Sequence, residues 1–115
     1  CGWASIFPIV DARVQSEACP MFFRIGTGDA LRLAFASAGF KSISLRRLQT
    51  TLFHSNAAEA CAAAFVGGPV ALAYSRFSED VKAAAQQDYL HSIEEYRSGD
   101  GYAIPGEFVI VAGNT

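Results

Sequence analysis

The pattern of apolar and polar positions is clearest between residues 28 and 53, where it changes from a helical to an extended period. Apolar side chains first recur at the i, i+3, i+4 and i+7 spacing of one buried helical stripe, at Leu31, Ala34, Phe35 and Ala38. The side-chain oxygen of Thr27 or Asp29 can accept from a free backbone N–H at the start of such a helix. The pattern therefore predicts a capped helix with one face in the core.

The end of this helix and the strand after it are also marked. Gly39 stops the helix, and Phe40 stands where a Schellman motif places its hydrophobic contact. The apolar positions then alternate, but they slip from one strand face to the other after Leu45. We expect one long strand over residues 43 to 53, with a bulge or a strong twist near residues 46 and 47.

Helical spacing also marks the N-terminal segment, at Trp3, Phe7, Val10 and Val14. Pro8 favours a helix that begins near Phe7 with the proline in its first turn. A dense apolar cluster follows, made of Met21, Phe22, Phe23 and Ile25. Such a cluster is usually core, and its functional interpretation is the wall of an apolar pocket.

Three more helices are expected before the last strand. Ser55 or Asn56 can cap the first, and Glu59 fits a capping arrangement there. Pro69 can start a short second helix. Ser78 opens the third, whose buried side is expected at Val81, Ala85, Tyr89, Ile93 and Tyr96, with Arg97 in its last turn.

The final strand is expected over residues 107 to 112, after an extended stretch from residue 102 to residue 105. Its sequence, EFVIVA, is nearly all apolar. That composition is typical of a strand that is buried on both faces. We therefore predict two long, adjacent, antiparallel strands, the earlier one over residues 43 to 53.

Composition narrows the class of protein. The 115 residues fit one domain, and 51% of them are apolar whereas only 17% are charged. This balance predicts that a partner chain covers part of the apolar surface. A net charge of −2 with no basic run argues against nucleic-acid binding. No apolar run reaches the roughly 18 residues that a membrane span needs.

The three cysteines, Cys1, Cys19 and Cys61, are odd in number and irregularly spaced. Without a CxxC pair they support neither a zinc site nor a disulfide framework, so no metal is predicted. We interpret them as reduced thiols of a cytoplasmic protein.

The order helix, AGF, strand, helical segment and "GDGYAIPGEFVIVAG" resembles the C-terminal part of class I S-adenosylmethionine-dependent methyltransferases of the small-molecule, UbiE-like (type 11) kind. The resemblance implies that residues 43 to 53 are the sixth strand of that fold. It also implies that residues 107 to 112 are the seventh, antiparallel strand. Residues 3 to 25 would then be an insert that helps to cover the substrate.

The chain lacks the motif with which that family binds its cofactor. No strand here leads into a glycine-rich D/E-x-G-x-G-x-G loop, and Gly26-Thr27-Gly28 lacks the third glycine and a preceding acidic residue. We therefore expect a fragment or a shortened relative, without a cofactor site of its own. S-adenosylmethionine would bind only if the missing N-terminal half were present.

Few residues suggest catalysis. His54 lies at the end of the predicted strand and could act as a general base, although a loop histidine with a local hydrogen bond is the commoner case. Arg46 and Arg47 could bind an anion or form a solvated strand edge. Tyr102 could orient a ligand at a pocket mouth. No catalytic residue is assigned, and an independent enzyme that uses His54 is the least favoured hypothesis.

The predicted fold is α/β: a partial Rossmann-like methyltransferase fold with four to five helices and two long adjacent antiparallel strands at one sheet edge. One domain over residues 1–115 would contain a cover segment (1–28), a helix–strand unit (29–53), a helical insert (54–98) and the final strand (99–115). The pocket residues predicted are Trp3, Phe7, Met21, Phe22, Phe23, His54 and Tyr102.

The leading function is the substrate-covering C-terminal portion of a small-molecule methyltransferase, or a truncated relative, that transfers no methyl group by itself. The alternative is a small homodimeric module that binds an apolar molecule. In either case we expect a homodimer, formed through the edge of the final strand or through exposed apolar surface.

Overall fold

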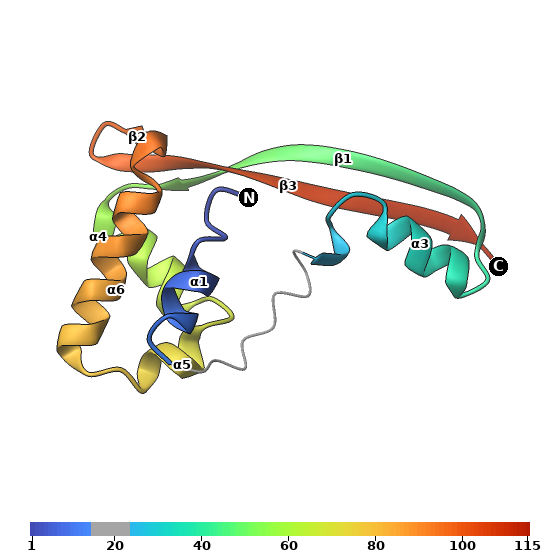
Figure 1. Ribbon diagram of the computed structural model, residues 1–115. Helices are drawn as coiled ribbons and strands as arrows, with labels where there is room; N and C mark the ends of the chain where they lie inside the picture. The colour runs from blue at the N-terminus through green and yellow to red at the C-terminus, as the bar shows by residue number, and fades with distance from the viewer. Residues whose placement is uncertain (15–23) are drawn as a thin grey trace. The chain divides into compact units, whose positions relative to one another are not determined.

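A computed structural model of the protein describes residues 1–14 and 24–115 (Figure 1). Within these ranges the α-helices are α1 (Ile6–Asp11), α3 (Ala30–Ser37), α4 (Ala57–Cys61), α5 (Ala71–Ser75) and α6 (Glu79–Ser92). A π-helical turn, η1 (Ala62–Val66), continues α4, and a 3₁₀ turn, η2 (Glu94–Tyr96), follows α6. The strands are β1 (Lys41–His54), β2 (Arg97–Ser98) and β3 (Gly101–Asn114).

The strands form one antiparallel sheet in the order β1-β3-β2. The start of β3 lies against the end of β1, because a Cβ on Gly101 would stand 2.0 Å from the carbonyl oxygen of His54. The short β2 pairs Arg97 with Tyr102 and Ser98 with Gly101. The predicted mixed α/β class and the two long antiparallel strands are confirmed, and β2 adds a strand that the sequence pattern did not indicate.

The chain divides into two compact units. Unit 1 contains the described residues of Cys1–Ala18 and Thr51–Gly106, and unit 2 those of Cys19–Thr50 and Glu107–Thr115. Both β1 and β3 continue from one unit into the other. In β3 the buried positions are Gly101, Tyr102, Ile104 and Gly106 in unit 1, whereas the odd-numbered residues from 107 to 113 in unit 2 are half-buried.

Unit 1 has an apolar core. Its largest fully buried side chains are Tyr89, Tyr102, Phe65, Ile6, Ile93, Ile104, Val10 and Val70. The ring of Phe65 stacks on Tyr74 with the centroids 4.8 Å apart and meets the edge of Tyr89 at 5.6 Å. The π-helical turn that carries Phe65 is therefore anchored in an aromatic cluster.

Helix α1 packs against α6 in unit 1. The hydroxyls of Ser5 and Ser92 are 2.7 Å apart, and Arg13 forms an ion pair with Asp88. The helix begins one residue before Phe7 with Pro8 in its first turn, as predicted. These polar contacts hold its apolar face, Ile6 and Val10, in the core.

Side-chain caps fix the starts of two helices in unit 1. Asn56 Oδ1 accepts from the backbone N–H of Glu59 at 2.9 Å, and the Glu59 carboxylate accepts from the N–H of Ser55 at 2.9 Å. Ser78 Oγ accepts from the N–H of Val81 at 3.4 Å. Both predicted caps are confirmed, but the last helix stops at Ser92, so Arg97 lies in β2 and not in its last turn.

The Schellman stop predicted after α3 is confirmed in unit 2. The N–H of Phe40 donates to the carbonyl of Phe35 at 3.1 Å, and that of Gly39 donates to Ala36 at 3.0 Å. Gly39 has a φ of +89°, which glycine adopts without the steric cost that a Cβ brings. The rings of Phe35 and Phe40 complete the motif at 4.9 Å.

Of the two capping candidates, Asp29 stands at the N-cap of α3 but caps no backbone N–H, and its carboxylate accepts from Arg32 at 2.7 Å. Two other expectations for unit 2 were wrong. No residue of α3 is buried, so the predicted buried stripe is absent. The final strand is not buried on both faces, since Phe108 and Ile110 are 64% and 48% exposed. One described helix beside two strands offers too few layers to enclose these side chains.

Arg47 joins three segments of unit 2. Its guanidinium forms an ion pair with Glu107 of β3 and donates to the carbonyl of Gly28 at 2.7 Å and of Gly26 at 3.3 Å. Gln49 donates to the same carboxylate at 2.5 Å. Arg47 of β1 therefore bonds both the segment before α3 and the strand β3.

Candidate functional site

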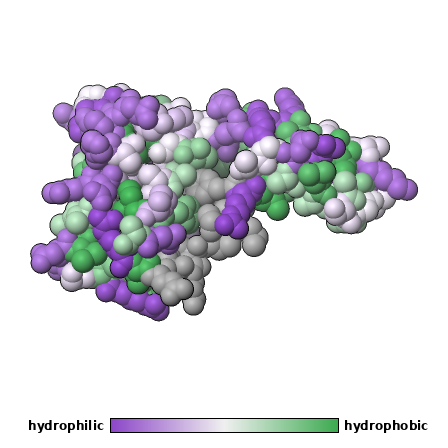
Figure 2. Space-filling view, viewed as in Figure 1, coloured by the Kyte–Doolittle hydropathy of each residue, from purple (hydrophilic) through white to green (hydrophobic). Residues whose placement is uncertain are grey.

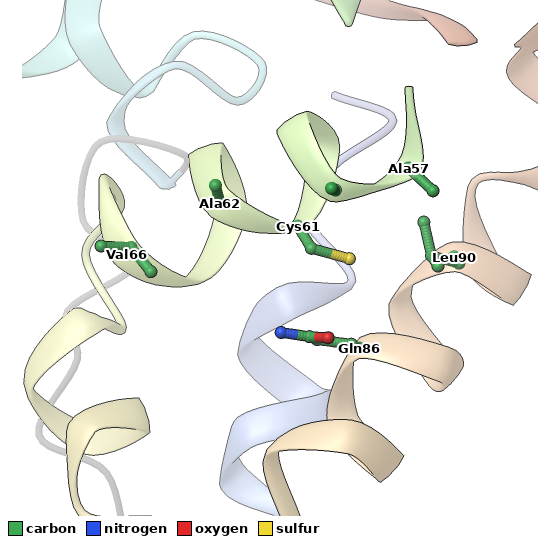
Figure 3. Close-up of a pocket in the computed structure, with 7 residues that line it drawn as sticks. Ala57, Cys61, Ala62, Val66, Gln86 and Leu90 are labelled. Carbon is green, nitrogen blue, oxygen red and sulfur yellow. The ribbon is translucent and has the colours of Figure 1, made fainter. Parts of the chain in front are cut away.

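The cavity described for this protein lies in unit 1, between the α4–η1 segment and α6 (Figure 3). Its volume is about 360 Å³, and its lining residues are Ala57, Ala58, Cys61, Ala62, Val66, Gln86 and Leu90. We call it the α4–α6 cavity. The small side chains of α4 create it, because alanine methyl groups leave space where larger side chains would fill the gap between the helices.

Gln86 is the polar residue in the wall of the α4–α6 cavity. Its Nε2 donates to the hydroxyl of Tyr74 at 2.7 Å. The ammonium of Lys82 lies 5.8 Å from the centre of the Tyr74 ring and donates to Glu79 at 2.8 Å. The amide of Gln86 is thus held in place by α5, and it gives an otherwise apolar cavity one hydrogen-bonding group.

The thiol of Cys61 lines the cavity and is only 5% exposed. In Figure 3 its sulfur points toward α6. Burial raises the pKa of the Cys61 thiol, because an apolar environment disfavours the thiolate. Burial, and to a lesser degree the nearby Cys61, raises the pKa of Tyr89 to about 12. With its pKa raised, the Cys61 thiol is protonated at neutral pH, so it gives the cavity wall no thiolate nucleophile.

The predicted pocket residues that the structure describes, Trp3, Phe7, His54 and Tyr102, do not line this cavity. Phe7 and Tyr102 are core residues, 8% and 1% exposed, and Trp3 lies just before α1. The Tyr102 hydroxyl accepts from Arg97 at 3.1 Å, and the guanidinium lies 5.1 Å from the ring centre, which gives Tyr102 a structural role. The remaining predicted pocket residues of the N-terminal part, Met21, Phe22 and Phe23, lie outside the described residues.

His54 ends β1 next to the cap of α4. The carboxylate beside it is Glu59, whose pKa is lowered first by the hydrogen bonds from Ser55 and then by the nearby His54. Ser55 thus holds the Glu59 carboxylate in its charged form at the cap. His54 itself is the last residue of β1 and not a loop residue.

Residues 1–14 and 24–115 bring no three His, Cys, Asp or Glu side chains together in a way that could hold a metal ion. Across the same residues, no helix is both long enough and apolar enough to cross a bilayer. What the described part of the chain does offer is a small apolar cavity with a fixed amide, which suits binding more than bond-making chemistry.

Comparison of the chain with protein-family models, with curated proteins and with solved structures finds no match. The cavity itself was missed by the sequence pattern, which directed attention to aromatic residues. The available signal was the run of alanines from residue 57 to residue 64, where small residues recur on the side that faces α6.

Proposed function

We propose that this chain is the substrate-covering C-terminal portion, or a shortened relative, of a class I S-adenosylmethionine-dependent methyltransferase of the small-molecule kind, and that it transfers no methyl group by itself. One observation carries the proposal. The elements follow one another in the order that the resemblance implies. They are helix α3 with its Schellman stop, strand β1, a helical segment, and strand β3, which returns antiparallel beside β1.

The helices of unit 1 are the cover in this proposal. Helices α4 and α6 enclose the α4–α6 cavity, whose volume of about 360 Å³ is near the lower limit for small-molecule sites. Its apolar wall favours an apolar part of a substrate, and Gln86 provides one polar contact for orientation. The same proposal keeps the protein in the cytoplasm, where Cys1 and Cys61 remain free thiols.

The cofactor would be held by another part of the protein. The sequence has no glycine-rich loop after a strand, and such a loop with a helix N-terminus is what receives the charged part of a nucleotide-like cofactor. Calorimetric titration of the chain with S-adenosylmethionine should therefore show no binding heat. Saturable binding at micromolar concentrations would contradict the proposal.

The reading frame upstream of Cys1 gives the decisive test. We expect it to encode a strand, a glycine-rich loop and a helix, and the joined protein to bind S-adenosylmethionine. Ala62→Trp, which fills the α4–α6 cavity, should then reduce methyl transfer without changing cofactor affinity. Ala63→Trp is the matched control, because Ala63 is an exposed neighbour that does not line the cavity. Equal losses of methyl transfer in both variants, or an upstream reading frame that encodes no glycine-rich loop, would contradict the assignment.

The cavity also favours a second candidate, a small homodimeric module that binds an apolar molecule. Native mass spectrometry of protein purified from cells would detect a retained ligand. In the isolated chain, Ala62→Trp should lower the affinity for an apolar fluorescent dye at least several-fold, whereas Ala63→Trp should not. Dye binding together with a frame that lacks the glycine-rich loop would favour this second function over the first.

A further inference from the structure

The outer edge of β3 in unit 2 has no strand beside it among the described residues. On that edge β2 reaches only Gly101 and Tyr102, and the N–H of Gly2 donates to the carbonyl of Pro105 at 2.9 Å. From residue 106 to residue 114, β1 is the sole neighbouring strand of the described chain. A row of unpaired N–H and C=O groups is a template for another strand.

The alternation of an antiparallel ladder identifies the groups on this edge. Gly101 pairs with β2 across a two-residue turn, and Pro105 accepts from Gly2, so odd-numbered positions face away from β1. Continued along β3, this alternation leaves the backbone of Val109 and of Val111 facing outward. The even-numbered Ile110 bonds toward β1.

The edge also lacks the features that normally keep two strand edges apart. No charge or proline occurs from residue 108 to residue 115. The nearest carboxylate, Glu107, is neutralised by Arg47 and bonded by Gln49. Beside the edge, Phe108 and Ile110 are 64% and 48% exposed, and Figure 2 shows apolar surface over the same part of the chain.

We propose that two copies of this chain pair through the outer edge of β3, antiparallel about a two-fold axis at Val109. A row of unpaired backbone groups binds another extended strand. The same segment of a second copy can provide that strand, because it carries no charge that would repel its counterpart. The axis places Phe108 of each copy opposite Ile110 of the other, so both exposed side chains gain an apolar neighbour. The inference is independent of the proposed function, since it requires no cofactor and no substrate.

Sedimentation velocity over a range of concentrations tests the proposal with the full chain. We expect a dimer, and Phe108→Lys should weaken it by at least about tenfold in Kd because the change places two ammonium groups in the pairing face. Leu72→Lys is the matched control, since Leu72 on α5 is 68% exposed and belongs to unit 1. This control should dimerise as the parent does.

Hydrogen exchange of the unmodified protein gives a second test that no folding defect can obscure. The amides of Val109 and Val111 should become protected as the concentration rises, whereas that of Ile110 should be protected throughout. An unmodified protein that stays monomeric at its solubility limit overturns the proposal. That result would favour another protein as the partner of this edge. Equal weakening by Phe108→Lys and Leu72→Lys, or unchanged exchange at Val109, overturns it as well.

Discussion

Unit 1 and unit 2 share the same two strands, yet they are stabilised in different ways. Every buried apolar side chain of the described residues belongs to unit 1. The described residues of unit 2 include none, and two of its large apolar residues, Leu33 and Phe108, are 55% and 64% exposed. Unit 2 is held instead by the Schellman motif after α3, by the Arg47 contacts and by the ladder between β1 and β3.

The contrast shows that a segment can form regular secondary structure without burying its side chains in a core. Helix α1 is shorter than α3, yet it buries Ile6, Phe7 and Val10, because α6 lies against it. Helix α3 has the stronger local signals and buries nothing. The burial of a helix depends on how many layers of secondary structure surround it. The positions of its ends depend on the residues within a few positions of each end.

The largest effect is expected from truncation of the aromatic cluster in unit 1. Phe65→Ala should reduce the free energy of unfolding by about 3 to 5 kcal/mol, because a fully buried ring is replaced by a cavity. Phe35→Ala in unit 2 should cost about 1 kcal/mol, since that ring is partly exposed and chiefly contacts Phe40. Urea denaturation measures both. Equal losses would remove the distinction between the units.

A close backbone approach in unit 1 should give the next largest loss. A Cβ at residue 101 would stand 2.0 Å from the carbonyl oxygen of His54, and neither backbone can move without disturbing the β1–β3 ladder. Gly101→Ala should therefore cost about 3 kcal/mol. Gly67→Ala should be nearly neutral, because its added carbon meets the nearest atom at 3.4 Å. Thermal unfolding that ranks the two variants in the reverse order would refute this account.

Alkaline pH should weaken unit 1 through Tyr89. The phenol titrates near pH 10 in the unfolded chain and near pH 12 in the folded protein, so the unfolded state releases its proton first. The stabilisation is complete below pH 10 and is lost as the pH rises toward 12, by roughly 2 to 3 kcal/mol. Denaturation curves of Tyr89→Phe should lack most of this slope. A slope equal to that of the parent would assign the effect to other groups.

A smaller loss than that of Gly101→Ala is expected at the helix stop of unit 2. Gly39→Ala places a Cβ at a φ of +89° and should cost about 1 to 2 kcal/mol. The change should appear chiefly as faster hydrogen exchange at the end of α3, where Phe40 donates to Phe35. Gly39→Asn should lose less, because asparagine tolerates the left-handed region better than alanine. Faster exchange in unit 1 of the same size would indicate one cooperative unit.

Features set by neighbouring residues were predictable from the sequence. The stop at Gly39 and Phe40 needs only residues 35 to 40, the segment that its two hydrogen bonds span. The caps at Asn56 and Ser78 likewise depend on a side chain and an N–H three residues later. These contacts involve residues at most five positions apart, so their pattern can be recognised without knowledge of the rest of the fold.

Burial and the cavity depend on segments that are far apart in the chain. An apolar run such as residues 108–111 fits a covered strand as well as an exposed edge, and only its neighbours in space decide between them. The α4–α6 cavity depends on how closely Cys61 approaches Gln86, which is 25 positions later in the sequence. Aromatic density suggested Phe7 and Tyr102 for the pocket, but large rings also fill cores, and here they do.

The contacts of α1 with α6 have a consequence for synthesis on the ribosome. Arg13 and Ser5 find their partners 75 and 87 residues later in the chain. At about 5 to 20 residues per second, the longer separation corresponds to roughly 4 to 17 seconds of translation. Throughout that interval Ile6 and Val10, both fully buried in the finished fold, have no α6 to pack against. Helix α1 of the nascent chain therefore keeps its apolar face uncovered by α6 until translation has passed Ser92.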